Sequence, residues 1–99
     1  MIVPMPDEID VTNADNVLAL LDGALGPGVA LVIADMTSTV FCDSAGVRIL
    51  MLAQRKAAAS GAELRLAMPP AGMVHRILDL MNLLPHMNVY PTTAAAAAG

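Results

Sequence analysis

Ser44 is the residue whose type and position are best suited to chemistry. It lies in the segment Asp43-Ser44-Ala45-Gly46, between a short apolar stretch and a predicted helix. Backbone N–H groups converge at a helix N-terminus, which makes such a position favourable for an anionic group. Simple N-capping by Ser44 or Asp43 is the commoner use of these residues. The two roles are compatible, because a serine that caps a helix can also be modified.

The other reactive side chains lack the partners that catalysis requires. A Gly-x-Ser-x-Gly elbow is absent, since Cys42 stands two residues before Ser44, and neither His75 nor His86 has an evident acid to orient it. A helix N-terminus lowers the pKa of a thiol such as Cys42, but the neighbouring Asp43 raises it, and a buried packing role is favoured. One Cys and two separated His match no metal-site spacing. We therefore predict a non-enzymatic protein without catalytic residues, metal or cofactor.

Acids and hydroxyls follow the predicted strands and point to one edge of a sheet. Ligand sites in α/β proteins lie beyond the carboxyl ends of parallel strands. Solvated loop acids and helix caps are the commoner explanation for such residues. The sequence nevertheless predicts one rim that gathers Asp10, Asn13, Asp35, the hydroxyl loop at 37–39 and Ser44.

The elements that must position these residues alternate along the chain. Apolar runs predict strands at about 2–6, 29–34, 63–68 and 87–90, with a short apolar step at 40–42. Helical spacing predicts helices at about 14–25, 44–60, 70–82 and 93–99, the first capped by Asn13 or Thr12. The third helix is expected to bury Val74, Ile77, Leu78 and Met81. The predicted fold is a single α/β domain, residues 1–99, with a mixed, mostly parallel sheet of about four strands and helices packed against it.

Composition excludes several classes of protein. The chain is 57% hydrophobic and 14% charged, and its longest apolar run is too short to cross a bilayer. Residues 1–47 hold seven acids and no Lys or Arg, whereas residues 48–99 hold five basic residues and two acids. No basic cluster with interleaved aromatics exists, so we predict neither nucleic-acid nor membrane binding. A cytoplasmic protein whose acidic face meets a basic partner is expected.

Several segments together resemble the STAS domain, and more narrowly a bacterial anti-sigma factor antagonist. They are, in order, Glu8-Ile9-Asp10-Val11-Thr12-Asn13-Ala14, Val32-Ile33-Ala34-Asp35-Met36-Thr37, Phe41-Cys42-Asp43-Ser44-Ala45-Gly46-Val47, Gly61-Ala62-Glu63-Leu64-Arg65-Leu66 and Val89-Tyr90-Pro91-Thr92. They cover nearly the whole chain in the order and spacing of that family. The Asp-Ser-x-Gly core is the most telling motif.

The resemblance implies a partner switch. The antagonist binds an anti-sigma factor that is also a serine kinase, and this frees the sigma factor to regulate transcription. The kinase then phosphorylates the serine of the motif, here Ser44, and a metal-dependent serine phosphatase resets the switch. In the family the aspartate equivalent to Asp10 lies near that serine. The partner-binding residues implied for this chain are Asp10, Asn13, Thr37, Ser38, Asp43, Ala45, Gly46 and Val47.

The chain departs from the family pattern in two places. Ala45 stands where the family usually has Ser or Thr, so a second regulatory hydroxyl is absent. The family usually has a further strand before Ile2-Val3, and without it an open sheet edge would allow a homodimer. The alternative function is a STAS scaffold or sensor module that acts in a larger signalling assembly without phosphorylation.

Overall fold

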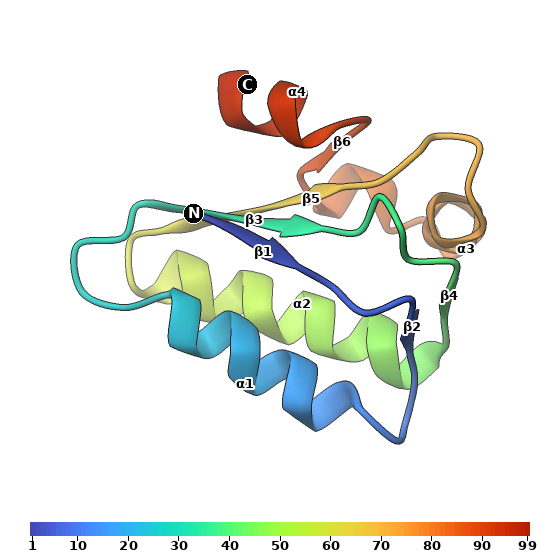
Figure 1. Ribbon diagram of the computed structural model, residues 1–99, viewed down its shortest axis with the longest axis horizontal. Helices are drawn as coiled ribbons and strands as arrows, with labels where there is room; N and C mark the ends of the chain where they lie inside the picture. The colour runs from blue at the N-terminus through green and yellow to red at the C-terminus, as the bar shows by residue number, and fades with distance from the viewer.

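Parallel strand pairing organises the fold, which the computed structural model describes for residues 1–99 (Figure 1). The main sheet has four strands in the order β1-β3-β5-β6, and β2 pairs with β4 as a separate ladder. The α/β class with a parallel sheet of about four strands is confirmed. The elements are β1 (Ile2–Pro4), β2 (Glu8–Ile9), α1 (Ala14–Ala24), β3 (Leu31–Asp35), β4 (Phe41–Cys42), α2 (Ser44–Ala59), β5 (Glu63–Ala67), α3 (Met73–Leu80), the 3₁₀ turn η1 (Leu84–His86), β6 (Val89–Tyr90) and α4 (Thr93–Ala98).

Strand β3 is covered on both faces, as its continuous apolar sequence predicts. Val32, Ile33 and Ala34 are all fully or almost fully buried. Helices α1 and α2 lie against one face of the sheet, and the short α4 lies against the other (Figure 1). The main core lies under α1 and α2, whereas a small second core joins Ile33 and Ala67 to Ala96 of α4.

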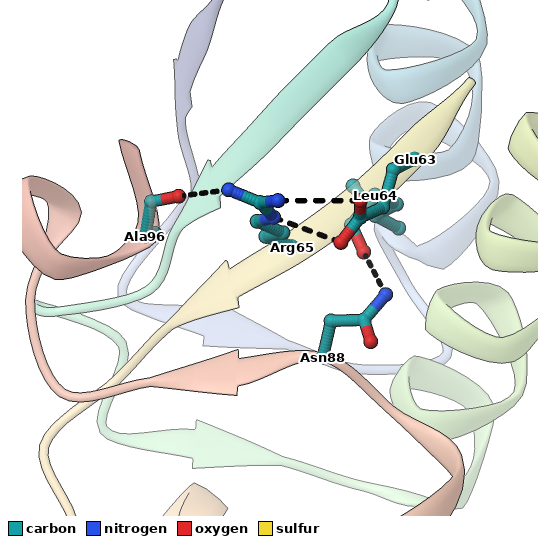
Figure 2. Close-up of polar contacts among 5 residues, drawn as sticks. All are labelled: Glu63, Leu64, Arg65, Asn88 and Ala96. Atoms are coloured by element: carbon teal, nitrogen blue, oxygen red, sulfur yellow. Dashed lines mark hydrogen bonds and ion pairs between the residues drawn. The ribbon is translucent and has the colours of Figure 1, made fainter. Parts of the chain in front are cut away.

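Arg65 of β5 ties α4 to the sheet (Figure 2). Its guanidinium donates a hydrogen bond of 2.6 Å to the Ala96 carbonyl and forms an ion pair of 2.8 Å with Glu63. The guanidinium carbon also lies 5.4 Å from the centre of the Tyr90 ring, within cation–π range. Only 13% of the Arg65 side chain is exposed. An alanine-rich helix of six residues is too short to be stable alone, so α4 depends on this bond and on the apolar packing of Ala96.

Three local features differ from the sequence prediction. The β2–β4 ladder was not predicted, because strands of two residues show no periodicity. Helix α3 begins at Met73 with Gly72 as its N-cap, several residues after the two prolines. It ends at Leu80, so the prediction that Met81 faces inward is wrong: the residue follows the helix and is 48% exposed. The predicted stop of α2 is confirmed, since Gly61 after the helix has φ +77°.

Candidate functional site

The start of α2 divides two roles between neighbouring residues. Asp43 is the N-cap in extended conformation, and its Oδ1 accepts a hydrogen bond of 3.0 Å from the Gly46 N–H. Its backbone carbonyl accepts one of 2.9 Å from the Val47 N–H. Ser44 follows as the first helical residue, with an exposed side chain that takes no part in the cap. Capping therefore belongs to Asp43, and the Ser44 hydroxyl is left facing solvent.

Asp43 also joins α2 to the turn before α1. Its Oδ2 accepts a hydrogen bond of 3.1 Å from the Val11 N–H, and its own N–H donates one of 3.1 Å to the Ile9 carbonyl. The β2–β4 ladder continues this connection (Figure 1). Asp10 lies between two residues that are bonded to Asp43, and so in the same local structure as Ser44.

Gly46 lies where α2 packs tightly against the β2–β4 ladder. A Cβ atom there would come within 2.5 Å of the Cys42 Sγ and 2.7 Å of the Ile9 carbonyl oxygen. Only glycine therefore allows this approach. Gly46 and Val47 are both buried, so they can serve a partner only by holding Ser44 in place. Ala45 is half-buried and borders a shallow hollow between α1 and α2.

Asp10 and Asn13 close the turn that precedes α1. The Asp10 Oδ1 accepts hydrogen bonds from the hydroxyl and from the backbone N–H of Thr12, and these bonds hold the pKa of the Asp10 carboxyl below its usual value. The Asn13 Oδ1 accepts from the Asp10 N–H at 2.9 Å, and its amide donates to the Glu8 carbonyl at 2.8 Å. Asn13 is the N-cap of α1, as predicted, but its side chain makes no capping hydrogen bond and bonds back across the turn instead.

Thr37 and Ser38 lie in the turn between β3 and β4, apart from Ser44. The Thr37 N–H and hydroxyl both donate to the Asp35 Oδ1, at 3.1 and 2.6 Å. This turn and the start of α2 lie at opposite ends of β4 (Figure 1). The hydrogen bonds of the predicted rim residues therefore fall into two groups, which β4 separates along the chain. One cluster holds Asp10, Asn13, Asp43 and Ser44, and the other holds Asp35, Thr37 and Ser38.

Two exposed residues beside Ser44 were not predicted as site residues. Val11 has an apolar side chain that is 76% exposed, and its backbone N–H donates the hydrogen bond to the Asp43 Oδ2. Arg48 is exposed, lies one helical turn after Ser44, and lines the same hollow as Ser44, together with Arg55 and Met81. The spacing of four residues between Ser44 and Arg48 was a signal in the sequence, because such residues share one face of a helix.

The remaining reactive side chain, Cys42, is packed away. Its side chain is 1% exposed, and burial, followed by the charge of Asp43, raises the pKa of the thiol to about 11. A thiol with this pKa is almost entirely protonated at neutral pH, which makes it a poor nucleophile. No three His, Cys, Asp or Glu side chains lie together as metal ligands would. None of the helices has both the length and the apolar character needed to cross a membrane.

Comparisons with known proteins agree with this fold. The family model of the STAS domain matches residues 1–96. A putative anti-sigma factor antagonist from Thermotoga maritima has a similar structure, with a TM-score of 0.82, 21% identity, and coverage of 98% of this chain and 85% of that one. An anti-sigma factor antagonist from Mycobacterium paratuberculosis has a TM-score of 0.81, 22% identity, and coverage of 98% and 82%. Among curated proteins no relative is found. The chain belongs to the STAS domain family.

Proposed function

We propose that residues 1–99 act as one STAS domain in the cytoplasm, as an anti-sigma factor antagonist. In this proposal the chain binds an anti-sigma factor that is also a serine kinase, and phosphorylation of Ser44 ends the binding. A metal-dependent phosphatase then restores the unmodified form. The observation that carries the proposal is the exposed Ser44 hydroxyl, which stands first in α2 while Asp43 performs the capping.

The geometry of the helix start favours a phosphate on Ser44. Asp43 occupies the amides of Gly46 and Val47, which leaves the N–H groups of Ser44 and Ala45 without a partner in the chain. The first turn of α2 also contains no acidic side chain. A negative charge at an exposed helix N-terminus stabilises a protein by about 0.3–1 kcal/mol. The phosphorylated domain is therefore expected to keep its fold.

Release of the partner must then arise at the interface. A phosphoserine carries about −1.5 to −2 charges and three bulky oxygens. Against a partner already packed on Ser44, this group would overlap with partner atoms and would repel any acidic groups of the partner nearby. A loss of about 1.4 kcal/mol weakens binding tenfold, so one phosphate is sufficient for a switch.

The proposed contact surface is centred on Ser44 and uses the side chains that remain accessible. Asp43 and Ala45 flank the serine in the chain, Asp10 and Asn13 lie in the turn that is bonded to Asp43, and the buried Gly46 and Val47 support this position. Thr37 and Ser38 would make a second contact at the far end of β4. Strand β1 is at the edge of the main sheet, so a homodimer through this edge is compatible with the proposal.

Phosphorylation of the intact protein tests the proposed acceptor. The chain is incubated with its anti-sigma kinase and ATP, and the modified residue is mapped by mass spectrometry. We expect modification of Ser44, its loss in Ser44→Ala, and no change in the matched control Ser60→Ala, which alters an exposed serine at the other end of α2. Equal phosphorylation of Ser44→Ala would place the acceptor elsewhere.

The Ser44→Asp variant tests whether negative charge at position 44 weakens partner binding without destabilising the fold. Ser44→Asp should weaken binding to the anti-sigma factor at least tenfold while the melting temperature stays within a few degrees of wild type. Loss of the fold would contradict the argument that α2 tolerates negative charge. A complex that forms but never responds to ATP would instead support the alternative, a STAS scaffold or sensor module without phosphorylation. The feature that favours this alternative is Ala45, which stands where the family usually has Ser or Thr.

A further inference from the structure

Two adjoining hollows lie along α2, and together we call them the trough, which begins at Ser44. The two hollows, of about 330 and 300 Å³, lie side by side on this helix and share Met51 and Arg55 in their walls. The first contains Ser44 and Arg48, and the second reaches η1 and the buried Met87. The Gln54 side-chain amide donates a hydrogen bond of 2.6 Å to the His86 carbonyl, which fixes η1 against α2 at the far end.

The trough combines an apolar floor with unpaired positive charge. Met51, Met81 and Met87 supply flexible thioether side chains, which adapt to the shape of an apolar partner surface. The two ion pairs of the domain are Lys56–Asp22 and Arg65–Glu63, so Arg48 and Arg55 have no acidic partner. Neither hollow contains an Asp or Glu, although the chain as a whole carries a net charge of −4.

This pattern selects one kind of occupant. We propose that the trough binds an acidic amphipathic helix of the partner protein, with its apolar side on the methionines and its carboxylates on Arg48 and Arg55. Helices bind grooves of this kind through apolar residues on one face, and guanidinium groups pair with carboxylates in a bidentate manner. The trough therefore has the opposite charge preference to the acidic N-terminal half of the chain.

Arg48 links this surface to the proposed phosphorylation of Ser44, and this part rests on the proposed function. Ser44 and Arg48 are four residues apart on α2 and line the same hollow, so a phosphate on Ser44 is within reach of the guanidinium. Asp15, on α1, is the acid that shares the opposite hollow with Arg48, and it forms no ion pair with it. Phosphorylation would thus occupy Arg48 and place a dianion at the mouth of the trough, which repels an acidic helix.

Methyl NMR tests the trough without any kinase. The full chain is labelled at its methionine methyl groups and titrated with two designed helical peptides that share one apolar face and carry Glu or Lys on the polar face. We expect the Glu peptide to shift Met51, Met81 and Met87 but not Met73, and the Lys peptide to shift none of them. Binding of both peptides alike, no binding of the Glu peptide, or shifts centred on Met73 would overturn the proposal.

Charge reversal supplies the matched variants. Arg48→Glu and Arg55→Glu should each weaken the Glu peptide at least tenfold, whereas Arg76→Glu, an exposed arginine of α3 outside both hollows, should leave binding unchanged. An equal loss of peptide binding in Arg76→Glu would show that the net charge of the chain explains the effect, and this would overturn the proposal. If the free chain forms a dimer and the Arg55→Glu variant is a monomer, the trough binds a second copy of the chain, and this result would also overturn the proposal.

Genetically encoded phosphoserine at position 44 separates this proposal from the proposed function. The phosphorylated chain should bind the Glu peptide at least tenfold more weakly than the unmodified chain. In ³¹P titrations its phosphate pKa should rise when Arg48 is replaced by Gln and not when Arg76 is. An unchanged phosphate pKa in Arg48→Gln would overturn the role of Arg48. Because no kinase is used, failure of a kinase to modify Ser44 would reject the proposed switch and leave these results standing.

Discussion

Gly46→Ala tests whether close packing at the start of α2 holds the site together. The added Cβ would lie 2.5 Å from the Cys42 Sγ, 2.7 Å from the Ile9 carbonyl oxygen and 2.9 Å from the Ile9 Cγ2. The carbonyl cannot move freely, since it accepts the hydrogen bond from the Asp43 N–H. The clash must therefore displace α2 or break the link between α2 and β2.

The net cost follows from two opposing effects. Overpacking a well-ordered core typically costs about 1–3 kcal/mol, and three short contacts, one of them to backbone, favour the upper end. Replacing Gly by Ala inside a helix contributes about 1 kcal/mol in the other direction. We therefore expect Gly46→Ala to lower the free energy of unfolding by about 2 kcal/mol. For a domain of this length that corresponds to a fall of roughly 8–16 °C in melting temperature.

Gly23→Ala is the matched control. Gly23 is also inside a helix, α1, but a Cβ there would meet no atom within 4 Å. This variant should gain about 0.5–1 kcal/mol from helix propensity alone. Urea unfolding followed by circular dichroism measures both variants. A Gly46→Ala protein as stable as wild type, or stabilised like Gly23→Ala, would refute the packing argument.

Two further predictions concern Cys42 and Arg65. Burial raises the pKa of the Cys42 thiol to about 11 from an ordinary value of 9.0. The protonated thiol therefore makes its full contribution to the free energy of unfolding below pH 9, and that free energy should fall by about 2–3 kcal/mol as the pH rises to 11. Cys42→Ala should remove this part of the alkaline loss in urea titrations at pH 8 and pH 10.5, and an unchanged loss would contradict the assignment. Arg65→Met should speed hydrogen exchange of the α4 amides at least tenfold, because the bond to the Ala96 carbonyl is lost. Lys56→Met, which removes a half-exposed ion pair, should change stability by less than about 0.5 kcal/mol, and equal exchange in the two variants would contradict the anchoring role.

The main elements could be predicted because their patterns are long enough to carry a period. Strand β3 shows a continuous apolar run, and the end of α2 shows a glycine at the position that needs positive φ. The ladder of β2 and β4 could not be predicted, because each strand has two residues and the pairing spans more than thirty positions. That ladder is nevertheless what brings Asp10 to Asp43.

The site itself was predicted in part. The position of Ser44 at the start of a helix follows from local sequence, and the structure agrees. The assignment of the cap to Asp43 rather than Ser44 could not be decided, because both residue types cap helices equally well. The division of the rim hydrogen bonds into two groups depends on the direction of β4, and no local pattern contains that information.

The Asp-Ser-x-Gly segment separates the residues that build the start of α2 from the one whose side chain stays free. Both carboxylate oxygens of Asp43 are bound to backbone N–H groups, and Gly46 permits the contact that places them there. Ala45 is half-buried against α1, so the lack of a hydroxyl at this position leaves the architecture intact. Ser44 alone has a side chain outside this network. A modification of Ser44 can therefore change the charge of the surface without changing the fold beneath it, which is the property that a reversible binding switch requires.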